Sequence, residues 1–123
     1  MRKFGLVLLS GVLALTTPAA QGHSALVTST PKSGAVIKTF PKTFKLTFNE
    51  EILRLPGKEP SRVQLIAPNR KRISLGKVAI DSEVLTVPMS KSSVKAGKYR
   101  LTYRVVSKDG HVINGAISFT YKP

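Results

Sequence analysis

An aspartate and a histidine near the C-terminus, Asp109 and His111, are the residues whose types and spacing could carry chemistry. They lie two positions apart, so in an extended backbone both side chains would leave the same face. Gly110 between them allows a bend that a bulkier residue would resist. A carboxylate beside an imidazole provides half of a transition-metal site. The remaining ligands must come from elsewhere in the chain.

Few other residues could provide nitrogen or sulfur ligands, because the chain has 2 histidines and no cysteine. The other histidine, His23, follows a segment typical of a secretory signal peptide. A basic start at Arg2 and Lys3 precedes an apolar run over residues 4–15, which is short for a membrane span of about 20 residues. We therefore expect cleavage of this segment rather than its retention as an anchor.

Small residues at the end of this segment set the cleavage site. Ala20 and Gly22 stand at the two positions that a signal peptidase reads, which predicts a removed signal peptide over residues 1–22 and a mature domain over residues 23–123. Cleavage after Ala19 or Ala20 is an alternative that fits this pattern less well. Cleavage after Gly22 makes His23 the first residue of the mature chain.

An N-terminal histidine has unusual value as a metal ligand. His23 would offer its α-amino nitrogen and its ring Nδ1 to one metal ion. A free α-amine has an ordinary pKa of about 7.7–8.0, and a metal can displace its proton near neutrality. With the ring of His111 and an oxygen of Asp109, three nitrogens and one oxygen in a tetragonal arrangement favour Cu(II). The sequence thus predicts one Cu(II) per chain, held in a histidine brace.

Length, composition and charge limit the classes of protein that fit. After cleavage the chain is one small domain, and without cysteine it has neither disulfides nor a thiolate metal site. The formal net charge of +14 would suggest nucleic acid for a cytosolic protein. For an exported one we expect no nucleic acid, and anionic lipid headgroups or an acidic partner are favoured. A solvated lysine-rich surface is the simpler alternative.

The mature chain has the pattern of an all-β protein. Short runs that alternate between apolar and polar residues are separated by proline and glycine, and no long helical period occurs. The run Val94–Tyr99 is typical of the tyrosine corner of immunoglobulin-like domains. We predict an immunoglobulin-like Greek-key β-sandwich of about seven strands. The expected strand regions are residues 24–29, 43–48, 63–65, 71–80, 84–87, 98–105 and 117–121.

Four segments carry a resemblance to a known family. They are the opening His23–Val27 with Ser29–Pro31 and Gly34, the strand end Leu46–Glu50, the run Ala96–Tyr99, and the run Val105–His111 followed by Gly115 and Phe119. Together they cover essentially the whole mature chain and resemble the copper resistance protein CopC family. The resemblance implies a periplasmic immunoglobulin-like β-sandwich that takes part in copper homeostasis or resistance and is not an enzyme.

The same resemblance implies a ligand set. Residues His23, Asp109 and His111 stand where the family binds Cu(II), and some members place a glutamate at the position of Glu50 at or near the site. For Asp109 the alternative is a turn-capping role. For Glu50 the alternative is an ordinary exposed glutamate beside Glu51.

The resemblance also has a departure. Family members that bind Cu(I) carry a methionine-rich loop with a histidine, but residues 53–61 of this chain contain neither residue type. Cu(I) prefers soft thioether ligands, so we predict a Cu(II)-only protein, with Met89 serving in packing. The family implies an inner-membrane CopD-type transporter as partner.

Two further classes of function are open to such a chain. A histidine brace also serves copper polysaccharide monooxygenases, but those are larger enzymes with a flat aromatic surface, and this chain has no tryptophan. A structural β-sandwich with incidental histidines is the other alternative. The sequence has no Ser/His/Asp triad, phosphate-binding loop or zinc-finger spacing.

Overall fold

A computed structural model describes residues 25–123 of the chain. The predicted signal peptide and His23 lie outside the described residues. Within residues 25–123, no helix has the length and apolar character needed to cross a membrane.

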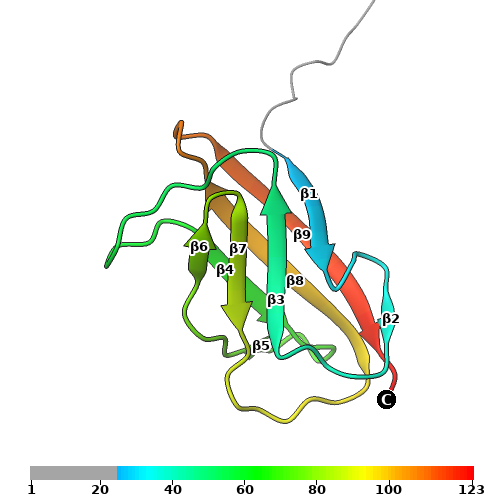
Figure 1. The fold of residues 1–123 in the computed structure, drawn as a ribbon. Helices are drawn as coiled ribbons and strands as arrows, with labels where there is room; N and C mark the ends of the chain where they lie inside the picture. The colour runs from blue at the N-terminus through cyan, green and yellow to red at the C-terminus, as the bar shows by residue number, and fades with distance from the viewer. Residues whose placement is uncertain (1–24) are drawn as a thin grey trace, which may run out of the picture.

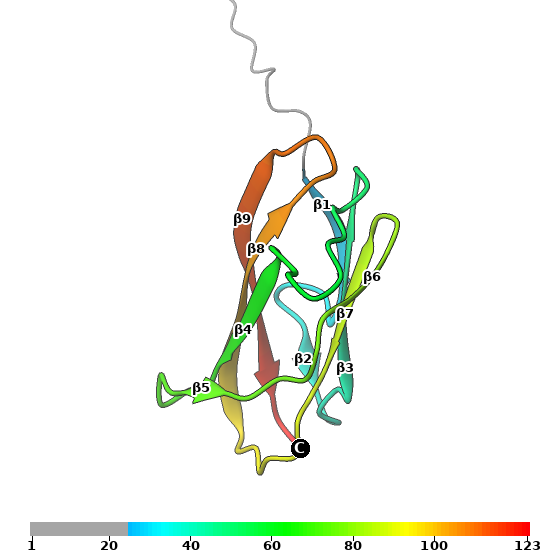
Figure 2. The same ribbon diagram turned by 90° about the vertical axis from the view of Figure 1, so that its left-hand side faces the viewer.

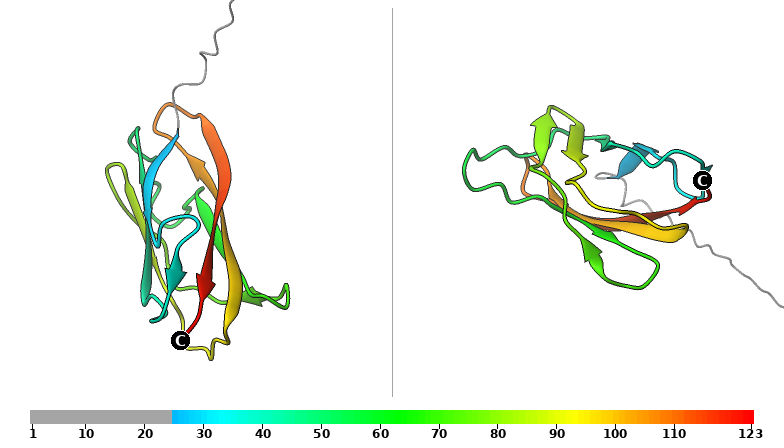
Figure 3. Two further views of the ribbon diagram at one scale, coloured as in Figure 1. Left: turned by 90° about the vertical axis from the view of Figure 1, so that its right-hand side faces the viewer. Right: turned by 90° about the horizontal axis from the view of Figure 1, so that it is seen from below.

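Strands of the described part of the chain form two sheets, in which all pairs are antiparallel except that of β2 with β9 (Figure 1). One sheet has four strands in the order β1-β3-β7-β6, and the other has five in the order β2-β9-β8-β4-β5. The views from the side and from below show the two sheets stacked as a sandwich (Figures 2 and 3). The strands are β1 Leu26–Thr30, β2 Val36–Ile37, β3 Thr43–Phe48, β4 Arg62–Ile66, β5 Arg72–Ile73, β6 Ala79–Asp81, β7 Val84–Pro88, β8 Gly97–Val106 and β9 Val112–Tyr121. The predicted all-β sandwich is confirmed.

The strand count differs from the prediction at two places. The run over residues 71–80, expected as one strand region, contains β5 in the five-stranded sheet and β6 in the four-stranded sheet. The chain crosses between layers there, so the run cannot remain one strand. The two-residue strand β2, which pairs parallel with the end of β9, was not predicted because two residues are too few to show alternation.

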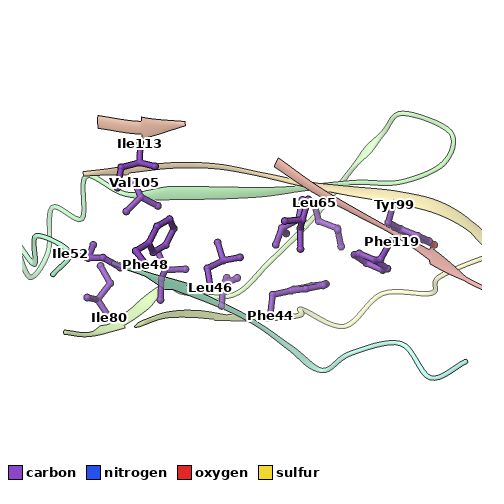
Figure 4. Close-up of a cluster of buried hydrophobic side chains, with 14 residues drawn as sticks. Phe44, Leu46, Phe48, Ile52, Leu65, Ile80, Tyr99, Val105, Ile113 and Phe119 are labelled. Carbon is purple, nitrogen blue, oxygen red and sulfur yellow. The ribbon is translucent and has the colours of Figure 1, made fainter. Parts of the chain in front are cut away.

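Alternating apolar residues of β3 form the centre of the core. Phe44 and Leu46 are fully buried and Phe48 is almost so, while Lys45 between them is exposed. Figure 4 shows these side chains pointing from the four-stranded sheet toward those of the opposite layer. The opposing side chains include Leu65, Tyr99, Leu101, Val105, Ile117 and Phe119. Because strand alternation sends these residues inward, the sequence pattern alone accounts for the sandwich. Met89 packs partly buried against this core, as predicted.

The predicted tyrosine corner is present at the start of β8. The buried Tyr99 hydroxyl donates a hydrogen bond to the Lys95 carbonyl at 2.6 Å and accepts one from the Lys95 amide at 3.0 Å. The Tyr99 ring also stacks on Phe119 of β9, with ring centroids 5.5 Å apart. The corner therefore fastens the β7–β8 connection to the core.

Tyr99→Phe should lower the free energy of unfolding by about 1–3 kcal/mol, because the Lys95 backbone groups lose their partner while the ring stays packed. The matched control is Tyr121→Phe, since within residues 25–123 the Tyr121 hydroxyl makes no hydrogen bond. Urea denaturation of both variants measures the difference. Equal losses would show that the corner contributes nothing beyond ring packing.

Candidate metal centre

Three of the predicted site residues meet at one end of the sandwich. Glu50, Asp109 and His111 each place one ligand atom within 4.8 Å of the others. The Nδ1 atom of His111 lies 3.9 Å from the Oε1 atom of Glu50. The His111 side chain is 56% exposed, whereas that of Glu50 is only 20% exposed, so the imidazole lies nearer the surface and the carboxylate lies against the protein. One nitrogen and two carboxylate oxygens at this spacing suit a divalent transition-metal ion.

The β8–β9 turn presents Asp109 and His111. Ser107 is fully buried, and its amide donates to the His111 carbonyl at 2.8 Å while its Oγ accepts from the His111 amide at 3.2 Å. The amide of Gly110 donates to the Ser107 carbonyl at 2.8 Å, and Gly110 has φ +90°, a conformation that favours glycine. The expected bend at Gly110 is confirmed.

The backbone around Asp109 differs from the extended strand that the two-residue spacing suggested. Residues 108 and 109 lie in a hydrogen-bonded turn, and β9 begins only at Val112. Asp109 and His111 therefore converge because the chain folds back through Gly110, not because strand alternation places them on one face. The alternative capping role for Asp109 is not seen, since its side chain makes no hydrogen bond to any residue within 25–123.

Glu50 is positioned by the segment that follows β3. The Asn49 side chain accepts a hydrogen bond from the Ala25 amide at 2.9 Å, and the Asn49 amide donates to the Ala25 carbonyl at 3.0 Å. Next to Glu50 on the other side, the Glu51 carbonyl accepts from the Lys108 amide at 2.9 Å, and the two side chains form an ion pair at 3.6 Å. Glu50 thus lies between a contact to the start of the described chain and a contact to the β8–β9 turn.

Negative charge gathers at this end although the chain as a whole is strongly basic. Besides Glu50, Glu51 and Asp109, the β6–β7 turn brings Asp81 and Glu83 to the same end. This turn is tied in place by two hydrogen bonds, from the Phe48 amide to the Glu83 carbonyl and from the Ile52 amide to the Ser82 carbonyl, both 2.9 Å. Five of the 6 acidic residues therefore lie in segments at this end of the sandwich. These carboxylates attract a divalent cation to this end, although the net positive charge of the whole chain opposes its approach.

Sequence reasoning found the groups that can bind metal and missed those that position them. Asn49 and the Glu51–Lys108 pair were not recognised, because their contacts join segments far apart in the sequence. The role of Ser107 was also missed, although its hydrogen bond to the His111 amide is local. A serine two positions before Asp109 was the only local signal. His23 lies outside the described residues, and its place in the ligand set stays a prediction, as do the roles of Glu50, Asp109 and His111.

Comparison with known proteins identifies the family. The CopC domain profile matches residues 26–122. The chain belongs to the CopC family. Copper resistance protein C of Xanthomonas campestris pv. juglandis is 34% identical over 113 residues, covering 89% of this chain and 87% of that protein. The crystal structure of CopC from Methylosinus trichosporium OB3b superimposes with a TM-score of 0.67 and 27% identity, covering 82% of this chain and 95% of that one.

A third relative places a similar domain in a longer protein. Copper transport protein CutJ of Bacillus subtilis (strain 168) is 28% identical over 102 residues, which cover 80% of this chain but 18% of CutJ. The match to this CopC-family chain is therefore confined to a minor part of that relative.

The hydrogen bonds of Ser107 generate a prediction about this centre. Ser107→Ala removes the acceptor of the His111 amide, so the β8–β9 turn should become less fixed. We expect an affinity for Cu(II) about 10-fold lower, within the roughly 10–100-fold range of groups that orient metal ligands.

The matched control is Ser29→Ala, which removes a buried serine hydroxyl that donates to the Pro31 carbonyl at 2.8 Å in the β1–β2 connection. Both variants should lose similar thermal stability, but only Ser107→Ala should bind Cu(II) more weakly in a competitive titration. Equal affinities of the two variants would show that the turn needs no support from Ser107.

Proposed function

We propose that this chain is an exported copper carrier or buffer of the periplasm that holds one Cu(II) at the acidic end of its β-sandwich. The ligands are the α-amine and ring of His23, the ring of His111 and the carboxylate of Asp109, with Glu50 at or beside the metal. The observation that carries the proposal is the convergence of Glu50, Asp109 and His111 within 4.8 Å in a chain of the CopC family. Relatives named copper resistance protein C support the copper assignment.

The start of the described chain supports the inclusion of His23. Ala25 is fixed by two hydrogen bonds to Asn49, the residue before Glu50. His23 precedes Ala25 by two positions, and two residues span at most about 7 Å. The covalent chain therefore keeps His23 within reach of a metal held by its neighbours. Removal of residues 1–22 would free its amine for binding.

The oxidation state follows from the ligand chemistry. Nitrogen and carboxylate oxygen ligands suit Cu(II), whereas Cu(I) prefers thioethers. Met89, the single methionine of the described residues, packs partly buried against the core, and the loop between Ile52 and Arg62 contains no methionine. A separate Cu(I) site is therefore not expected.

A carrier fits the site better than an oxygen-activating enzyme. A copper oxygenase needs an open position at the metal for oxygen, but here two carboxylates, from Glu50 and Asp109, stand beside the His111 ring. With three nitrogens and at least one of these oxygens, the equatorial positions of Cu(II) are filled. For the partner we propose a CopD-type inner-membrane transporter. This is supported by the similarity to part of CutJ, a protein named for copper transport.

Substitution of the described ligands tests the proposal. His111→Ala should weaken Cu(II) binding by more than about 100-fold, beyond the effect of a group that only orients ligands. Asp109→Asn should cost less, about 10–100-fold, because it keeps the side chain's shape and one oxygen. Competitive titration against a chelator gives both affinities, and circular dichroism checks the fold.

The matched control for Asp109→Asn is Asp81→Asn, which removes one carboxylate from the same end but lies outside the group of converging ligand atoms. Asp81→Asn should leave the affinity within about twofold, since an exposed charge outside ligand distance is screened. Equal losses for Asp81 and Asp109 would reduce the role of Asp109 to general electrostatics.

The position of His23 provides an independent test. A protein that retains Gly22 keeps the imidazole but converts the amine into an amide, which is a poor ligand near pH 7. It should bind Cu(II) far more weakly and show fewer coordinated nitrogens by electron paramagnetic resonance. For the mature protein, affinity should fall as the pH drops, because nitrogen ligands must lose their protons before they bind.

The control adds one glycine after Pro123, at the opposite end of the chain. This variant should match the mature protein in affinity and spectrum. If the Gly22-containing protein also matched them between pH 6 and 8, the α-amine would not be a ligand and the brace would be wrong.

A further inference from the structure

The outward face of the five-stranded sheet carries a concentration of arginine. In β8 the residues between the buried positions point away from the core, and the register places their neighbours in β4, β5 and β9 on the same side. Five exposed cations result, which we call the basic face: Arg62, Arg72, Lys98, Arg100 and Arg104. The five-stranded layer is seen edge-on in Figure 2, with this surface turned away from the other sheet.

The outward face of the four-stranded sheet gives a direct comparison. Its register places Lys45 and Asp81 there among threonines, Val84, Ala79 and Pro88, so its charges balance. No acidic residue lies on the basic face, because all 6 acidic residues belong to β6 or to connections between strands. The net charge of the domain is therefore not spread evenly, and one of its two broad surfaces carries five cations and no acidic residue.

This arrangement is unfavourable for the isolated domain. Arg62 of β4 stands directly opposite Arg104 of β8, and like charges in facing positions destabilise a sheet. Two rows further along this face, beyond the Gln64–Thr102 pair, Arg72 and Arg100 flank Ile66 from both sides. Within the described residues no carboxylate forms a salt bridge with any of these arginines. Negative charge supplied by a partner would relieve this repulsion.

The chemistry of the face suits phosphate. A shallow depression of about 340 Å³ lies between Arg62 and Arg104, and Gln64, Thr102 and Asn114 also line it. Guanidinium groups bind phosphate oxygens with two parallel hydrogen bonds, and amide and hydroxyl side chains can donate to the same oxygens.

We propose that the basic face docks this domain onto a membrane surface rich in anionic phospholipid. A protein partner would need large apolar or aromatic anchors, and valine is under-represented among such anchors. Of the large exposed hydrophobic residues, Val27 and Leu55 lie outside this sheet, and Val36 and Val112 are two separate valines on its outward side, beside opposite ends of β9. Binding of single-stranded nucleic acid would need exposed aromatic side chains for base stacking. Tyr103, the aromatic residue that lines the depression, packs edge-to-face on the buried Phe48 instead. A flat array of arginines with polar neighbours matches a layer of phosphate headgroups.

Docking in this way orients the metal centre. The strands of the basic face would lie along the membrane plane, and the acidic end with Glu50, Asp109 and His111 would face sideways near the surface. A membrane protein beside the docked domain could then reach the bound ion. This inference takes the proposed carrier function further and relies on its exported location, while the docking itself requires no copper.

The test uses the mature protein without copper and vesicles of phosphatidylcholine with or without 30% phosphatidylglycerol. The face variant carries Arg62→Gln, Arg100→Gln and Arg104→Gln. The control removes the same charge from exposed positions elsewhere, with Lys32→Gln, Lys45→Gln and Lys91→Gln. Co-sedimentation at low and at high salt gives the partition coefficients.

We expect binding only to the anionic vesicles, weakened by salt. Each basic side chain near an anionic surface contributes about fivefold to partitioning, so the face variant should lose roughly 100-fold and the control at most about tenfold. Equal losses in the two variants, or equal binding to both vesicle types, would overturn the proposal. So would a face variant that still binds vesicles but no longer binds soluble polyglutamate, since the face would then recognise an acidic protein.

Two further measurements separate this inference from the proposed function. The face variant should keep its Cu(II) affinity in solution, and His111→Ala should keep its vesicle binding. Thermal unfolding monitors the fold, and removal of facing arginines should not lower its midpoint. Should the triple variant unfold, Arg72→Gln with Arg100→Gln tests the same face, and undiminished vesicle binding of that pair would count against the proposal.

Discussion

The pairing of Ile52 with Ser107 joins the two sheets at the end where the candidate metal centre lies. Ile52 follows β3 of one sheet, Ser107 follows β8 of the other, and they form an isolated antiparallel bridge. Both residues are buried, and main-chain hydrogen bonds on either side, from Leu53 to Val106 and from Lys108 to Glu51, extend the contact. Since Glu50 comes from one sheet and His111 from the other, the convergence of their side chains depends on this junction.

Much of the fold could be predicted because it depends on local pattern. The alternation of Phe44, Leu46 and Phe48 identifies a half-buried strand from the sequence alone, and the position of Tyr99 indicates the corner that its hydroxyl forms. The partition of residues 71–80 between β5 and β6 was not predictable in this way. In the structure β5 pairs with β4 at the edge of one sheet, and β6 pairs with β7 at the edge of the other. These pairings depend on distant strands, and no residue within the run indicates them.

The same distinction between local pattern and long-range contacts applies to the candidate metal centre. Asp109 and His111 were found because their residue types and spacing are visible in the sequence, yet the reason given for their convergence was incomplete. The turn through Gly110, held by the buried Ser107, brings them together. Glu50 was reached only through family resemblance, because nothing near it in the sequence shows that the chain returns to it 59 residues later at Asp109. Long-range main-chain contacts, such as that of Asn49 with Ala25, leave no local signature.

Acidic and basic side chains lie in different regions of this small domain, which the net charge alone does not reveal. A formal net charge of +14 would by itself repel a copper ion, but five carboxylates gather at the junction end and five cations occupy one sheet face. Interactions between exposed charges farther apart than a Debye length of about 8 Å are largely screened at physiological salt, so each region acts on its own surroundings. An ion approaching the junction therefore meets a locally negative surface, while the arginine face meets whatever anionic surface lies beside it. The β-sandwich makes this possible because strand alternation fixes the face of each side chain and the connections alone form the ends.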